Sequence, residues 1–204
     1  MQATKICNDH HAVLPGLAEA PVTIGSDPES LATIAAPGVA LSIWSRPAPV
    51  PIAAADIEDF ASLRIEASVA TVASAMKDAL AQTPRRAWYQ PIVTDITQLA
   101  IRFAALMEVG GVEIRLECVT GNSCWKFHAD YLRARLITTY CGRGTEWAVQ
   151  DATLGPPRHM QAGDVSIFKG RVWLPAPRVL HRSPPIAETG EVRLLLVIDP
   201  LSKG

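Results

Sequence analysis

The C-terminal half of the chain constrains the fold most strongly, because it is a series of short, strand-like segments. From Gly111 onward, segments rich in β-branched and aromatic residues alternate with Gly, Pro and Asn turns. The segments are VEIRLECVT (112–120), YLRARLITTY (131–140), TEWAVQ (145–150), DVSIFKG (164–170), RVWLPA (171–176) and VRLLLVID (192–199). Strands spaced this closely favour an all-β barrel or a jelly roll.

The N-terminal half predicts a supporting helical layer. Residues 55–83 are rich in Ala, lack Gly and Pro, and carry apolar residues near helical spacing, so we expect one long helix or two short ones. Residues 94–111 predict a further helix, with Thr94 or Asp95 as its N-cap and two glycines at its end. A strand is expected within 38–44.

Together these segments predict an α+β fold: a jelly-roll barrel in the C-terminal half, with a helical layer from the N-terminal half packed on one side. We expect residues 1–30 to be an irregular N-terminal segment and 31–204 to form a single domain. Within it, 31–110 would supply a strand and the supporting helices, and 111–204 the jelly-roll core with a metal site.

Composition narrows the partners. The net charge is -1 and no run of Lys or Arg occurs, which argues against binding to a nucleic-acid backbone. The sequence shows no signal-peptide pattern and no apolar run of membrane-spanning length. Four cysteines are too few and too scattered for a disulfide framework, so we expect a cytoplasmic protein. Composition leaves the oligomeric state open.

The segment KFHADYLRAR contains a His-x-Asp triplet, His128 and Asp130. Five His and ten Asp among 204 residues would produce about 0.25 such triplets by chance, so the triplet alone decides nothing. Residues two apart in a strand point to the same side, however, and these two can share one ion. A divalent ion held firmly needs a third ligand from elsewhere in the chain.

His181 is the best candidate for that ligand, because it ends a predicted extended, apolar segment. His159, by contrast, is flanked by turn residues and is expected in a surface loop. Two His and one carboxylate on one side of a metal form the facial arrangement of non-haem Fe(II) oxygenases. Arg193 lies twelve positions after His181 (193 − 181 = 12) at the start of an apolar strand, where a buried guanidinium requires an anion.

This order of residues resembles the 2-oxoglutarate/Fe(II)-dependent oxygenase superfamily. The resemblance implies the prolyl-hydroxylase-like and cupin-like fold of that superfamily, a double-stranded β-helix (jelly roll). ARLITTYCGRGTEW and QAGDVSIFKG are similar to the strand–turn–strand and the Gly-Asp turn that follow the triplet in such proteins. The resemblance covers about residues 112–199. FHADYLRARLITTYCGRGTEW with VLHRSPP and RLLLVID more closely resembles an uncharacterised bacterial family, a domain of unknown function whose members are often encoded among zinc-homeostasis genes.

The resemblance implies that His128, Asp130 and His181 are catalytic metal ligands and that Arg193 binds the distal carboxylate of 2-oxoglutarate. The implied metal is Fe(II), with Zn(II) as the alternative. On the strand that follows the triplet, Ala134, Leu136, Thr138 and Tyr140 share one side. We expect that side to face the barrel interior, so that Thr138 and Tyr140 hydrogen-bond the cosubstrate.

Other residues offer weaker candidates. Cys7, His10 and His11 form a near-terminal set that suits Zn(II), and a mobile polar tail is the alternative interpretation. Cys124 and Cys141 could line the pocket, and Glu146 could orient a metal-binding histidine. Four arginines could surround the barrel mouth and favour an anionic substrate, namely Arg143, Arg171, Arg178 and Arg182.

Three functions remain open from the sequence. The first is an Fe(II)/2-oxoglutarate-dependent oxygenase acting through the His-x-Asp…His triad. The second is a cupin-like metal-binding protein for zinc or iron homeostasis, storage or sensing, without oxygenase activity. The third is a structural barrel in which the His and Asp side chains form a buried hydrogen-bond network.

Overall fold

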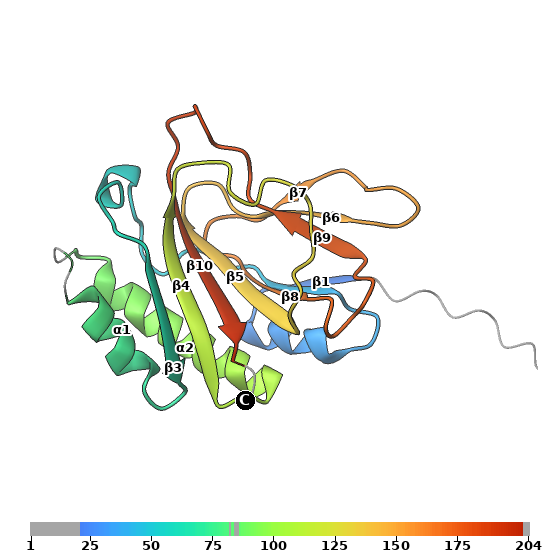
Figure 1. Ribbon diagram of the computed structural model, residues 1–204, viewed down its shortest axis with the longest axis horizontal. Coiled ribbons are helices and arrows are strands. Elements are labelled where there is room, and N and C mark those ends of the chain that lie inside the picture. Colours follow the sequence, from blue (N-terminus) through green and yellow to red (C-terminus); the bar gives the residue numbers. More distant parts are fainter. Residues whose placement is uncertain (1–20, 82, 84–85, 202–204) are drawn as a thin grey trace, which may run out of the picture.

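The computed structural model describes residues 21–81, 83 and 86–201, and its largest element is a mixed seven-stranded sheet (Figure 1). All neighbouring strands are antiparallel except β1 and β2, which are parallel. Across the sheet the strands are β1 (Val22–Gly25), β2 (Leu41–Trp44), β8 (Val165–Lys169), β5 (Ala134–Cys141), β10 (Arg193–Pro200), β4 (Gly111–Val119) and β3 (Leu63–Ser68).

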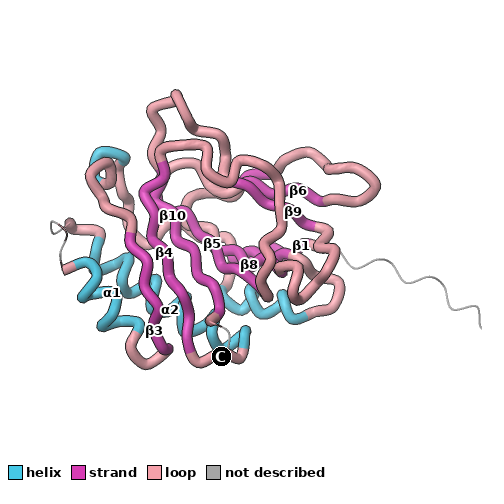
Figure 2. Tube along the Cα trace, viewed as in Figure 1, coloured by secondary structure: helices cyan, strands magenta, loops and turns pink. Residues whose placement is uncertain are grey.

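A second, three-stranded antiparallel sheet faces part of the first. Its order is β7 (Arg158–His159), β6 (Glu146–Val149) and β9 (Val179–Arg182). Apolar side chains from both sheets pack together between them, among them Ile43, Ile137, Trp147, Phe168 and Leu195. In Figure 2 the small sheet lies at the upper right, beside the ends of β5 and β8.

The helices cover the opposite side of the large sheet. They are α1 (Val72–Leu80) and α2 (Tyr89–Met107), with the 3-10 helices η1 (Pro28–Ala35) and η2 (Ala54–Asp56). The larger apolar core lies between this layer and the sheet, and Phe103 of α2 is fully buried in it. Among the described residues, no helix is long and apolar enough to span a membrane.

Each central strand of the large sheet therefore has two faces. We call the side packed against α1, α2 and η1 the helix face, and the side toward the small sheet the cavity face. In β4 the buried residues on the helix face are Val112, Ile114 and Leu116, and charged residues alternate with them. In β10, Leu194, Leu196 and Ile198 occupy the helix face in the same way.

Two local predictions were wrong. Residues 63–68 form strand β3 rather than helix, because Leu63, Ile65 and Ala67 alternate and pair in register with β4. Helix formation by the Ala-rich segment is thus confined to α1, where pairing with the sheet no longer competes. Residues 171–176 form no strand, since Trp173 N and Leu174 N both donate to Gly170 O in a turn.

The beginnings of two elements also differ from expectation. Helix α2 starts at Tyr89, with Trp88 as its N-cap, and Pro91 is tolerated because it lies in the first turn. Asp95 is therefore an interior residue of α2 rather than its cap. Part of the segment predicted to be irregular, 1–30, is ordered as β1 and the start of η1, because β1 pairs with β2. Residues 1–20, which include Cys7, His10 and His11, lie outside the described residues.

Candidate metal centre

The two histidines of the predicted triad lie opposite each other in a short backbone bridge. His128 N donates to His181 O at 3.0 Å, and His181 N donates to His128 O at 2.9 Å. Opposed residues of an antiparallel pair project their side chains to the same side, and the two imidazole centroids are 4.7 Å apart. Asp130, two positions further along, brings its carboxylate to the same point.

One ligand atom from each triad residue lies within 4.8 Å of the other two. His181 Nε2 is 3.2 Å from Asp130 Oδ2, and His128 Nε2 is 3.7 Å from Asp130 Oδ1. Ligand atoms about 2.0–2.2 Å from one ion are separated by roughly 3 Å when they subtend right angles. Small side-chain adjustments therefore suffice for all three residues to bind the same ion.

The carboxylate of Asp130 shows why a cation fits this position. Its Oδ2 atom is buried and has no hydrogen-bond partner among the described residues. A buried oxygen without a partner is costly unless it meets a cation. His128 offers a free Nε2 to the same ion, because its Nδ1 lies 2.8 Å from Lys126 O and donates its proton there.

The electrostatics of the triad favour the protonation states that metal ligands require. Burial lowers the pKa of His181, although the neighbouring Asp130 carboxylate partly offsets this effect. Burial alone would raise the pKa of Asp130, but His181 and the charge of Arg135 outweigh it, so the pKa of Asp130 is lowered. A neutral imidazole and an ionised carboxylate result.

Arg193, the predicted carboxylate-binding residue, is fully buried at the start of β10. Its Nε donates to Arg143 O at 2.6 Å, and its two terminal nitrogens donate to Ser183 Oγ at 3.0 Å and Thr139 Oγ1 at 3.3 Å. No carboxylate of the described residues forms an ion pair with it. Burial, with a contribution from the charge of Arg143, lowers the pKa of Arg193 to about 10.

A narrow cavity of about 80 Å³ lies between the sheets beside the triad. His128 and His181 line it together with Ser183, which binds Arg193. Small-molecule sites usually measure about 300–1,000 Å³, so a dicarboxylic acid enters only if lining side chains move. A larger hollow of about 580 Å³ adjoins α2 and Trp44, but its charged lining residues, Asp95 and Arg102, already form ion pairs.

The predicted roles of Thr138 and Tyr140 disagree with the structure. Both lie on the helix face of β5, and Tyr140 Oη donates to Asp95 Oδ2 in α2 at 2.7 Å. Thr138 is fully buried on the same face, and its hydroxyl has no partner among the described residues. The cavity face of β5 instead carries Arg135, Ile137 and Thr139.

The side of β5 opposite to the expected one therefore faces the cavity, and it includes a charged residue, Arg135. Arg135 is tolerated there because it pairs with Asp130 and Asp199. Leu136 and Tyr140 lie on the other side of β5 and pack against α2, which offers a larger apolar surface than the cavity does. The helix layer, which the pattern of one strand cannot place, decides the orientation.

The other candidates are dispersed. Cys124 lines the cavity, whereas Cys141 is buried toward the helix layer. Glu146 binds Arg182 at 2.6 Å and lies 3.4 Å from His159, so it orients neither triad histidine. Of the four arginines expected at the mouth, only Arg182 lines the cavity, and the others contact Glu191 (Arg143), Asp151 (Arg178) and Ala129 O (Arg171).

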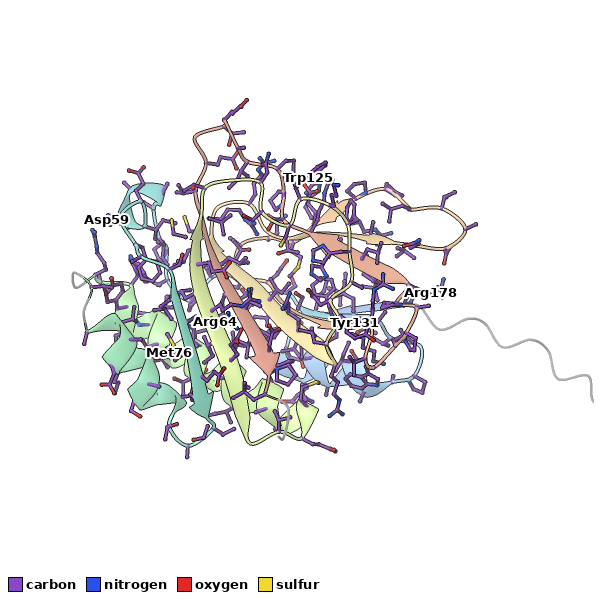
Figure 3. The ribbon with its side chains drawn as sticks, in the orientation of Figure 1. Asp59, Arg64, Met76, Trp125, Tyr131 and Arg178 are labelled. Carbon is purple, nitrogen blue, oxygen red and sulfur yellow. The ribbon has the colours of Figure 1, made fainter. Side chains whose placement is uncertain are left out.

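The sequence analysis missed four residues of the cavity face: Thr139, Ser183, Arg115 and Arg135. Arg115 and Arg135 occupy polar positions that alternate with apolar ones in their strands, and in the structure their side chains are only 25% and 18% exposed. An arginine of this kind needs an anion. Trp125 and Tyr131, which are labelled in Figure 3, flank the triplet along the chain and have exposed side chains.

Comparison with solved structures confirms the predicted α+β jelly-roll fold. The dioxygenase for auxin oxidation from rice is similar over 90% of this chain and 83% of its own, with a TM-score of 0.51 and 14% identity. The Arabidopsis thaliana dioxygenase for auxin oxidation 1, solved with 2-oxoglutarate, has a TM-score of 0.44 at 14% identity over 70% of this chain and 63% of its own. A Pseudomonas putida prolyl-4-hydroxylase has a TM-score of 0.44 at 15% identity, over 86% and 98% of the two chains.

This chain thus spans less than two thirds of the Arabidopsis enzyme. No curated protein matches the sequence. A family model described as "Protein of unknown function (DUF1826)" matches residues 25–199, which include the helix layer, the triad and both sheets apart from most of β1. The chain belongs to this family of proteins of unknown function.

Proposed function

We propose that the protein is a metal-dependent oxidoreductase, an Fe(II)/2-oxoglutarate-dependent oxygenase that hydroxylates a small-molecule or peptide substrate. The observation that carries the proposal is the placement of Arg193. A buried guanidinium without a carboxylate partner among the described residues lies one hydrogen bond from Ser183, in the wall of the triad cavity. A metal carrier has no need of this cation, whereas a dicarboxylic cosubstrate does.

The donor set supports the choice of metal. Two imidazoles and one carboxylate, with further positions open, are typical of non-haem Fe(II) sites. The same donors also bind Zn(II), which remains the alternative ion. His128, Asp130 and His181 would hold the metal, and the free Oδ2 of Asp130 would be satisfied by it.

The remaining residues would bind and orient the cosubstrate. Arg193 presents a planar fork, and a fork of this geometry binds a carboxylate through two parallel hydrogen bonds. Ser183 and Thr139 hold the fork in place before the ligand arrives. Bound Fe(II) and 2-oxoglutarate would supply the oxidising chemistry that uses O2. Ile137, Leu195 and Val197, which also line the cavity, would exclude water from it.

The test is anaerobic calorimetric titration of metal-free protein, first with Fe(II) and then with 2-oxoglutarate. We expect the wild-type protein to bind both. Arg193→Met should retain Fe(II) and lose affinity for 2-oxoglutarate by at least about 100-fold, because two charge-assisted hydrogen bonds disappear. His181→Gln should abolish Fe(II) binding. Release of succinate from 2-oxoglutarate in air would then report turnover.

Two further variants control for folding. Arg178→Met removes an exposed arginine that pairs with Asp151, and it should change neither affinity. Arg193→Lys keeps the buried charge but loses the fork, so it should bind 2-oxoglutarate weakly while folding normally. Wild-type protein that binds metal but no 2-oxoglutarate would overturn the oxygenase and assign the chain to metal storage or sensing, including zinc homeostasis.

A further inference from the structure

Arg135 connects the triad to the wall of the cavity. It lies on the cavity face of β5, and its side chain is 18% exposed. One terminal nitrogen donates to Asp130 Oδ1 at 2.5 Å. Nε and the other terminal nitrogen donate to Asp199 Oδ1 and Oδ2, each at 2.7 Å. The guanidinium of Arg135 therefore forms hydrogen bonds with two carboxylates from different segments, those of Asp130 and Asp199.

The contacts of Asp130 divide its carboxylate into two unlike oxygens. Oδ1 accepts the hydrogen bond from Arg135, whereas Oδ2 is buried, accepts no hydrogen bond among the described residues and lies 3.2 Å from His181 Nε2. We propose that Arg135 is a positioning residue that reserves Oδ2 of Asp130 for the metal and prevents Oδ1 from binding it. The inference rests on the metal site of the proposed function.

Asp199, the second carboxylate that Arg135 binds, holds the guanidinium of Arg135 in position. Asp199 is held on β10 and also accepts a hydrogen bond from Arg115 of β4 at 3.2 Å. Arg115 in turn contacts Glu113 and Glu117, and Glu113 pairs with the exposed Arg64 of β3. Alternating charges therefore run across β3, β4, β10 and β5 and end at the triad. A bidentate Arg–carboxylate pair has little rotational freedom, so Arg135 cannot follow a shift of Asp130.

The number of metal positions left open depends on this arrangement. With one oxygen from Asp130 and one nitrogen from each histidine, three positions of an octahedral ion remain for other ligands. A carboxylate that bound through both oxygens would occupy one of them. Arg135 therefore protects the space in which a chelating cosubstrate and a further small ligand would bind together.

Co(II) binding to the metal-free protein, without cosubstrate, tests this role. Arg135→Met should weaken Co(II) affinity about 10- to 100-fold, the usual cost of removing a partner of a metal ligand, and should change the visible Co(II) spectrum. Arg135→Lys, which can keep one hydrogen bond to Oδ1, should recover part of the affinity. Added guanidinium chloride at low concentration should restore affinity to Arg135→Ala and leave the wild type unaffected.

The matched control is Arg178→Met, which removes an exposed arginine outside the charge series (Figure 3) and should bind Co(II) as the wild type does. Asp199→Asn leaves the Asp130 contact in place and loosens only the far side, so a smaller loss is expected even if Arg135→Met folds poorly. Unchanged affinity and an unchanged spectrum in well-folded Arg135→Met would overturn the inference.

The two proposals fail separately. Co(II) binding that depends on Arg135, together with no binding of 2-oxoglutarate to the wild type, would leave Arg135 as a positioning residue and exclude the oxygenase. If the wild type binds 2-oxoglutarate and Arg135→Met leaves Co(II) affinity unchanged, the oxygenase proposal stands and the positioning role of Arg135 is excluded. Wild-type protein without Co(II) affinity would overturn both.

Discussion

The two faces of the large sheet are built from the same strands but from different chemistry. On the helix face, β5 and β10 present Leu136, Tyr140 and Leu196 to α2 in a continuous apolar core. On the cavity face, the same strands present Arg135, Arg193 and Asp199. The first face is satisfied by packing, and the second needs ionic or ligand partners. The apolar core and the proposed metal site thus lie on opposite faces of the same strands, at neighbouring positions along each strand.

Removal of a large side chain from the helix face should have the greatest effect on stability. Phe103→Ala creates a cavity in a fully buried position, and we expect the free energy of unfolding to fall by about 3–5 kcal/mol. Urea denaturation measures this loss. Metal affinity of the molecules that remain folded should be unchanged, and a parallel loss of affinity would contradict the separation of the two faces.

Low pH should destabilise the metal-free protein through His181, which lines the cavity. The pKa of His181 is lowered by burial below its ordinary 6.5, so the unfolded chain takes up a proton that the folded, metal-free protein does not. Stability should therefore fall as the pH drops through about 6.5. The pKa of Asp130 is also lowered, below 3.8, and its contribution is lost at still lower pH.

Thermal melting of metal-free protein between pH 8 and pH 5 measures the effect of His181. His181→Gln should flatten the dependence in this range. His159→Gln is the matched control, because the side chain of His159 is 60% exposed and its loss should leave the slope unchanged. If the melting temperature of His181→Gln falls with pH as steeply as that of the wild type, a group other than His181 causes the acid sensitivity.

Tyr140→Phe tests whether Tyr140 lies on the helix face of β5, as the structure has it, or on the cavity face. The substitution removes the hydrogen bond to Asp95, which Arg46 still binds through both oxygens, so the loss of stability should be about 1 kcal/mol. Affinity for metal and for 2-oxoglutarate should not change. A clear loss of 2-oxoglutarate affinity would return Tyr140 to the cavity.

Thr138→Val should have the smallest effect and the opposite sign. The hydroxyl of Thr138 is buried without a partner among the described residues, and Val has nearly the same shape. Its replacement should stabilise the protein by up to about 1 kcal/mol. A destabilised variant in the same urea experiment would reveal a hydrogen bond that this hydroxyl makes.

The clustering of the triad side chains and the burial of Arg193 were predictable, because the identity and order of these residues carry the information, while the roles of these residues stay predictions. His128 and Asp130 needed only strand alternation, and Arg193 needed only the cost of an unpaired buried charge. The faces of β5 were not predictable in this way, because Arg135 is acceptable inside only when Asp199, from a distant strand, is opposite it. The helical reading of 63–68 failed for a related reason, since β3 exists through its pairing with β4.

The bridge between His128 and His181 has a consequence for how the protein is held together. These residues are 53 positions apart (181 − 128 = 53), and two backbone hydrogen bonds join them. An ion bound by both would act as a cross-link that closes this long loop and ties the small sheet to the triplet. Metal at a hundred times its dissociation constant would add about 2.7 kcal/mol to stability, so the melting temperature itself would report whether the cell has supplied the ion.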